Sequence, residues 1–193
     1  PRRTFWCFLW QMLNQNTSCR EVVRQLQAVL ALHGIFNLDE GNSAYVQARQ
    51  RLPVQFLKEA LQDSAAAADR LAGPTCRLQG RNLKALDGST LTLADTPENQ
   101  ALYPQPKSQK PGCGFPILRV SVLFSLRSGA VLQTIPGNYY QHELRLFQAL
   151  QSHVAKDDIL LYDRAAGNYV VAATAKLWEA DLISRVAIRP IDF

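Results

Sequence analysis

Asn82-Leu83-Lys84-Ala85-Leu86-Asp87-Gly88-Ser89-Thr90 is the stretch that decides the fold, because it predicts a strand that ends on a carboxylate. The apolar run stops at Asp87, and the three small residues after it favour a turn. An acidic side chain in a strand is unfavourable without a partner, since Asp disfavours strands and a buried carboxylate is costly to desolvate. Two interpretations follow: Asp87 caps the turn, or it shares a cation with a second acid.

A second stretch of the same kind lies downstream, in Asp158-Ile159-Leu160-Leu161-Tyr162-Asp163-Arg164. Between the two stretches the sequence predicts a long polar loop, two strands joined by a short turn, and a helix. Strand-strand-strand-helix-strand, with acids on the first and fourth strands, is the order of a ribonuclease-H-like nuclease core. We therefore predict an α+β fold: a helical domain over residues 1–75, followed over 76–193 by a partial ribonuclease-H-like mixed sheet with helices.

The composition is that of a globular protein with an anionic partner. Of the 193 residues, 47% are hydrophobic, which is enough for a substantial core and argues against disorder. The net charge of +5 favours a polyanion as partner.

The four cysteines form no Cys-x-x-Cys pair and have no zinc-site spacing with the three histidines, so free thiols in a cytoplasmic protein are expected. No apolar run reaches the ~18–20 residues of a membrane span, so no membrane partner is expected.

Residues 4–72 read as helical. Ser18 and Glu21 have the spacing of a capping box, Gly34 is a stop signal, and Pro53 divides the later helical stretch. One interpretation is a helical bundle that packs on the next domain. The other is a DNA-binding domain that places arginines on phosphates, namely Arg2, Arg3, Arg20, Arg24, Arg49 and Arg51.

The stretch 93–116 is a polar loop rich in Pro, Gln, Lys and Gly, longer than most structureless connections in a compact domain. No acid occurs between Glu98 and Glu143, whereas Lys107, Lys110, Arg119 and Arg127 fall in that interval. An acid-free basic loop beside two carboxylates suits a polyanion that must reach metal ions. The alternative is a flexible surface loop.

The rest of the chain predicts the core elements. Residues 117–126 alternate around Val120, Val122 and Phe124 and form a hairpin with residues 130–135 through a turn at 127–129. Further elements are expected in sequence order: a helix opened by Gln141-His142-Glu143 and reaching Val154, a buried strand over 159–163, a helix over 164–178 and a strand over 182–188.

With these segments placed, the chain resembles the transposases of the insertion-sequence-4 family, which are DDE-type enzymes with a ribonuclease-H-like core. The resemblance covers essentially the whole chain. The matching motifs are Ser18-Cys19-Arg20, Leu86-Asp87-Gly88-Ser89-Thr90, Thr96-Pro97-Glu98-Asn99, Gln109-Lys110-Pro111-Gly112-Cys113-Gly114-Phe115-Pro116, His142-Glu143 and Asp163-Arg164.

The resemblance implies a site and its partners. Asp87 and Asp163 match the family's first two catalytic aspartates and are the expected ligands of Mg²⁺ or Mn²⁺. The expected partner is double-stranded DNA at transposon ends, with self-association as a further expectation. The residues expected to contact DNA are Lys107, Lys110, Arg119 and Arg164.

Two features depart from the family pattern. Ala165-Ala166-Gly167 follow Asp163-Arg164 where the family has Gly and an aromatic, and the Tyr-x-x-Arg-x-x-x-Glu motif that carries the third acid does not occur. We therefore expect the N-terminal part of a transposase, incapable of strand transfer by itself.

Three alternatives remain open from the sequence. The first is an active nuclease in which Glu143 or Glu179 completes the site, and the second is a noncatalytic DNA-binding remnant that regulates a full-length transposase. The third is an unrelated domain with capping aspartates.

Overall fold

The computed structural model describes residues 2–37, 39–73, 77–110, 112–141, 143–163 and 169–185. Contacts divide the chain into two compact units, Pro1–Glu59 and Ala60–Phe193. The division falls inside helix α4 (Val54–Leu71), upstream of the expected boundary at residue 75.

The first unit contains helices α1 (Arg2–Leu13), α2 (Cys19–Ala31) and α3 (Ser43–Gln50) and the first turns of α4. The Ser18 hydroxyl accepts the Glu21 N–H at 3.2 Å, so the predicted N-cap of α2 is present. At the other end, Gly34 has φ +78°, a conformation that glycine adopts without strain.

The interior of the first unit is small and includes a polar centre. Val22, Val23 and Tyr45 form its buried cluster. The Gln11 carboxamide oxygen accepts the Tyr45 hydroxyl at 2.8 Å and the Arg49 guanidinium at 3.0 Å. Arg49, expected on DNA phosphates, therefore has a structural partner inside its own unit.

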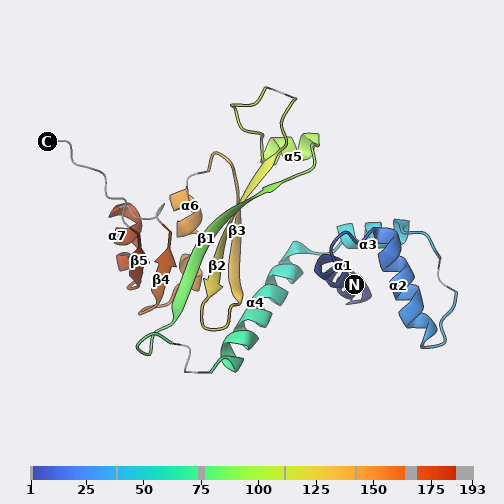
Figure 1. Cartoon of the computed structure of the whole chain (residues 1–193), viewed down its shortest axis with the longest axis horizontal. Helices are drawn as coiled ribbons and strands as arrows, with labels where there is room; N and C mark the ends of the chain where they lie inside the picture. Colours follow the sequence, from blue (N-terminus) through green and yellow to red (C-terminus); the bar gives the residue numbers. More distant parts are fainter. Residues whose placement is uncertain are drawn as a thin grey trace. The chain divides into compact units, whose positions relative to one another are not determined.

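The second unit is built on a five-stranded sheet of order β3-β2-β1-β4-β5 (Figure 1). Its strands are β1 (Leu83–Thr92), β2 (Ile117–Ser125), β3 (Val131–Asn138), β4 (Ile159–Tyr162) and β5 (Asp181–Ser184). β1, β2 and β3 pair antiparallel, whereas β4 pairs parallel with both β1 and β5. This is the mixed sheet of a ribonuclease-H-like core, and the predicted neighbourhood of the two aspartate strands is confirmed.

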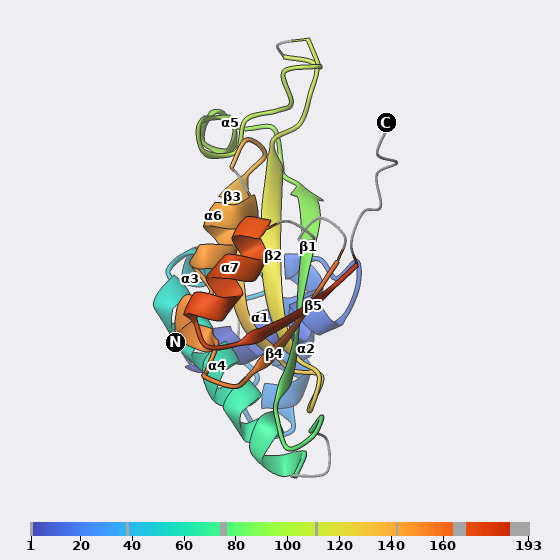
Figure 2. The same ribbon diagram turned by 90° about the vertical axis from the view of Figure 1, so that its left-hand side faces the viewer.

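Helices α6 (Glu143–Gln148) and α7 (Tyr169–Leu177) lie on one face of this sheet, as Figure 2 shows, with a 3-10 turn at Gln151–His153 after α6. The hydrophobic core lies between these helices and the sheet. Its buried residues are Leu86, Leu123, Phe147, Leu150, Leu160, Val171, Ala175 and Ala180. The helix predicted over 141–154 is thus shorter than expected and ends in a tighter turn.

Two edges bound the sheet. β3 is one edge and carries Pro136, which has no N–H to offer to a further strand. The other edge, β5, is described over only four residues. The predicted helix 164–178 and strand 182–188 match α7 and β5 over the described residues, and 164–168 and 186–188 lie outside them.

β1 corrects the expectation that a turn follows Asp87. The strand continues five residues further, paired with β2 as far as Thr92 and Ile117. Gly88, Ser89 and Thr90 favour a turn only locally, and the long antiparallel partner overrides that preference. Asp87 therefore lies within a strand and caps no turn.

The segment 93–116 is also more structured than the sequence predicts. It contains helix α5 (Pro97–Leu102), which Thr96 caps by accepting the Asn99 N–H at 3.2 Å. The two ends of the segment are joined by the bond from the Leu93 N–H to the Pro116 carbonyl at 2.9 Å.

Candidate functional site

The two aspartates line one pocket of about 350 Å³ in the second unit. Beyond Asp87 and Asp163, its walls come from the middle of β1, the start of β2, α6 and the end of β4. These residues are Gly88, Ser89, Thr90, Arg119, Val120, Ser121, Leu146 and Tyr162. The structure therefore brings together two acids that are far apart in the sequence.

Strand register explains why the acids meet. Leu86 of β1 is paired with Tyr162, the last residue of β4, and Asp87 and Asp163 are the residues that follow these two in the sequence. Corresponding positions on parallel neighbours point to the same face of a sheet. β4 ends at Tyr162 while β1 runs on with β2, so the pocket opens where the parallel pairing stops.

Both aspartates are exposed, and each is tied to its surroundings. The Asp87 carboxylate accepts the N–H of Gly88 at 2.8 Å. The carbonyl of Asp163 accepts the hydroxyl of Ser184, on β5, at 2.8 Å. Exposure leaves the carboxylates open to solvent and to ions that enter the pocket.

Arg119 brings a positive charge to the same pocket. It lies on β2 opposite Thr90, and its guanidinium lies 5.0 Å from the centre of the Tyr139 ring. Such cation–π contacts restrain a long side chain. Of the four residues expected to contact DNA, Arg119 is the one that lines the same pocket as the acids within the described part of the chain.

The two lysines of the 93–116 segment lie elsewhere. Lys107 stands over the Tyr140 ring at 5.4 Å, and its N–H donates to the Tyr140 hydroxyl at 2.7 Å. Lys107 lines a different pocket, and Lys110 is exposed. Arg164 lies outside the described residues.

Two glutamines that the sequence reading passed over hold this segment. The Gln100 carboxamide donates to Asp95 at 2.8 Å and to the Gly114 carbonyl at 3.1 Å, and its oxygen accepts the Gln105 N–H at 3.1 Å. Gln105 donates in turn to the Lys110 carbonyl at 2.8 Å.

A Cβ at Gly114 would come within 1.9 Å of the Gln109 side-chain oxygen, so the glutamine side chain would have to shift. The other glycine of the Pro-Gly-Cys-Gly block, Gly112, has φ +75°, a conformation that favours glycine. Tyr139 and Tyr140 were also missed, although two adjacent tyrosines after a predicted strand were a visible signal.

Of the acids that could serve as a third ligand, Glu179 and Asp181 have described side chains. Glu179 pairs with Lys156 at 2.9 Å, and Asp181 pairs with Arg81 at 2.6 Å. Both lie where β5 begins, whereas Asp163 follows the end of β4, which is roughly 13 Å away for a strand of four residues. Glu179 therefore does not complete this site. Nothing is described of the Glu143 side chain.

Among the described residues, no group of three His, Cys, Asp or Glu side chains is placed to hold a metal ion. Two carboxylates in one open pocket are nevertheless a donor set that a hard cation accepts, because Mg²⁺ prefers oxygen ligands and keeps several waters. The residues present therefore fit a divalent cation that two carboxylates bind weakly. No described helix combines the length and apolar character needed to cross a membrane.

Comparison of the sequence with known proteins finds relatives of one kind. The chain is 30% identical over 161 residues to the putative transposase InsZ of Escherichia coli K12, covering 81% of this chain and 52% of InsZ. It is 24% identical over 159 residues to the E. coli K12 transposase InsG of insertion sequence element IS4, covering 82% of this chain and 35% of InsG. The chain thus spans about half or less of these relatives' lengths. No family model matches.

Solved structures give more distant likenesses. A Mos1 transposase paired-end complex with the left transposon end matches 97% of this chain and 60% of its own, with 12% identity and a TM-score of 0.36. A piggyBac transposase synaptic complex with hairpin DNA matches 57% of this chain and 24% of its own, with 8% identity and a TM-score of 0.35.

Proposed function

We propose that this chain, by its sequence relatives a member of the IS4-type insertion-sequence transposases, carries the first two carboxylates of a metal-dependent site for DNA strand cleavage and transfer. The observation that supports this most is that Asp87 and Asp163 line one pocket, each directly following one of the last residues paired between β1 and β4, Leu86 and Tyr162.

Asp87 and Asp163 would hold Mg²⁺ or Mn²⁺. The metal would supply a nucleophile of lowered pKa and stabilise the leaving oxygen of a phosphodiester. The chain's own contribution is to fix the two carboxylates side by side. Two negative groups in one pocket repel each other, and a bound cation offsets that repulsion.

Arg119 would contact a phosphate of the same substrate. Arg119 is one of the residues that line the pocket, and its positive charge attracts a DNA backbone that the carboxylates alone would repel. Lys107 and Lys110 would contact the duplex away from the reacting phosphate, since they lie outside the acidic pocket. The partner we propose is the double-stranded DNA of transposon ends, with self-association when two ends are joined.

The second candidate is noncatalytic DNA binding that regulates a full-length transposase. The observation that favours it is that, among the described residues, no third His, Cys, Asp or Glu joins Asp87 and Asp163 in a group that could hold a metal ion.

A melting-temperature series tests the metal role. Wild type should gain stability in millimolar Mn²⁺ or Mg²⁺, because a ligand that binds only the native state adds RT ln(1 + [L]/Kd) to the free energy of unfolding. Asp87→Asn and Asp163→Asn should each abolish that gain, while Asp63→Asn, at an exposed acid of α4, should keep it. A wild type without any metal response contradicts the proposal.

The same preparations separate the two candidates. DNA cleavage by the isolated chain, lost in either aspartate variant, would establish catalysis without the third motif and exclude the regulator. A metal response without cleavage supports the noncatalytic candidate.

A further inference from the structure

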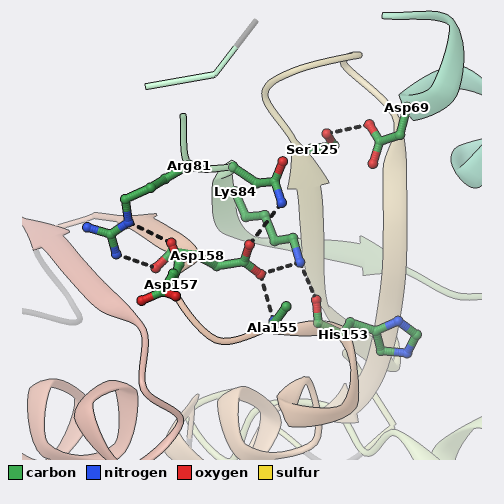
Figure 3. Close-up of polar contacts among 9 residues, drawn as sticks. Asp69, Arg81, Lys84, Ser125, His153, Ala155, Asp157 and Asp158 are labelled. Atoms are coloured by element: carbon green, nitrogen blue, oxygen red, sulfur yellow. Dashed lines mark hydrogen bonds and ion pairs between the residues drawn. The ribbon is translucent and has the colours of Figure 1, made fainter. Parts of the chain in front are cut away.

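A buried ion pair joins β1 to the segment that leads into β4, as Figure 3 shows. The Lys84 ammonium lies 2.5 Å from the Asp158 carboxylate, and the two side chains are 13% and 1% exposed. The other donors to this carboxylate are the N–H of Ala155 at 2.7 Å and the side-chain amide of Asn82 at 3.3 Å. Lys84 also donates to the His153 carbonyl at 2.6 Å.

Stability alone does not account for such a pair. Removing two charges from water is expensive, and apolar residues of similar volume often serve as well or better. The best attested benefit of a buried polar pair is that it specifies one alignment of the elements that it joins.

The sequence of β4 gives that alignment particular importance. β4 reads Ile159-Leu160-Leu161-Tyr162, with apolar residues on both faces, so alternation of polar and apolar side chains does not fix its register. Only four residue pairs join it to β1. A slip of one residue would leave apolar side chains on both faces but would send Asp163 to the face opposite Asp87.

The ion pair discriminates between these registers. Lys84 precedes Asp87 by three residues on β1, and its partner across the sheet, Leu160, precedes Asp163 by three. A slipped β4 would separate the Asp158 carboxylate from the Lys84 ammonium and leave both buried without their partner, which is strongly destabilising. Alignment at this end of the strands therefore decides which residues meet at the other end.

We propose that Lys84 and Asp158 form a register clamp, a positioning pair that holds Asp163 opposite Asp87. The functional part of this proposal rests on the metal role proposed above for the two aspartates. Neither clamp residue lines the acidic pocket, so the pair acts on the site through strand alignment.

The test uses a double variant, Lys84→Met with Asp158→Leu, which removes both charges without orphaning either. Its matched control is Lys156→Met with Glu179→Gln, which breaks an exposed ion pair beside the same strands. Mn²⁺ affinity is measured by paramagnetic-resonance titration, and register by nuclear Overhauser contacts between Leu86 and Tyr162. The neutral pair Lys84→Gln with Asp158→Asn serves as the conservative rescue.

The clamp double variant should unfold cooperatively, lose the single set of Leu86–Tyr162 contacts and bind Mn²⁺ about 10-fold or more weakly, because even a disturbed orientation of a metal ligand typically costs that much. The control should match wild type, and the neutral pair should restore much of the contact set and the affinity. Wild-type register and affinity in the clamp double variant overturn the proposal.

Two further results remain decisive. If wild type itself binds no Mn²⁺ through Asp87, the metal role fails, and the Leu86–Tyr162 contacts still decide whether the pair sets register. If the clamp double variant does not fold, Asp158→Asn alone is compared with wild type: weakened Mn²⁺ binding with altered contacts supports the clamp, and unchanged values overturn it.

Discussion

At the scale of single residues, His153 makes the stability of the folded chain depend on pH. Its ring nitrogen lies 2.9 Å from the Gln133 carboxamide, and its carbonyl accepts Lys84. Burial, with the nearby Lys84 charge as a smaller cause, lowers the pKa of His153 below its ordinary value of 6.5. The folded chain therefore resists protonation of this ring more than the unfolded chain does.

This lowered pKa predicts a pH dependence of stability. Below pH 6.5 the unfolded chain binds a proton that folded His153 refuses, so the free energy of unfolding falls as the pH drops toward the folded pKa. Denaturant titrations from pH 8 to 5 should show this loss, and His153→Gln should flatten it. The control His33→Gln, at an exposed histidine of the first unit, should retain the wild-type slope; equal slopes in all three proteins would contradict the assignment.

At the scale of elements, the end of α4 is fixed to the hairpin of β2 and β3 by one carboxylate. Asp69 accepts the hydroxyls of Ser125 and Ser128, each at 2.6 Å, and Arg127 donates to the Gly73 carbonyl at 2.8 Å. Ser125 is buried, so its hydroxyl depends on this acceptor.

Asp69→Ala should therefore destabilise the second unit by about 1–3 kcal/mol, because a buried hydroxyl is left without its partner. Asp63→Ala, at an exposed position of the same helix, should change stability by about 0.5 kcal/mol or less. Urea unfolding followed by circular dichroism measures both. Similar losses in the two variants would contradict the assignment, because Asp→Ala raises helix propensity at both positions and only Asp69 accepts the serine hydroxyls.

The elements also show how far sequence reasoning reaches. That Asp87 and Asp163 line one pocket was predictable, because acids that end apolar runs stand out in the sequence. The buried residues of β2 are Leu123 and Ser125, on the face opposite Val120, Val122 and Phe124. Alternation alone favours the Val120 face, but Leu123 packs in the core with Phe147 of α6 and Val171 of α7, which the sequence pattern does not reveal. Asp158 was missed because an acid before an apolar run reads as a cap, and its partner Lys84 lies 74 residues away.

At the scale of the whole molecule, the charge of +5 predicts DNA binding that weakens with salt. Each phosphate contact contributes about 0.9 to the slope of log affinity against log salt, so Lys107→Ala with Lys110→Ala should lower the slope by about two if both lysines contact phosphates. Lys156→Ala with Lys176→Ala removes the same charge elsewhere and is the control. Fluorescence anisotropy on a transposon-end duplex measures both, and an affinity independent of salt would exclude a cationic interface.

The two sheet edges have a consequence for how copies of this chain behave at high concentration. An open strand edge is a template on which another chain can add a strand, and such additions lead to aggregates and fibrils. Pro136 removes one donor from the β3 edge, and the described part of β5 offers only four residues for pairing. Replacing Pro136 with a β-branched residue such as Thr would restore a donor there, and with it a route from the folded protein to insoluble aggregates.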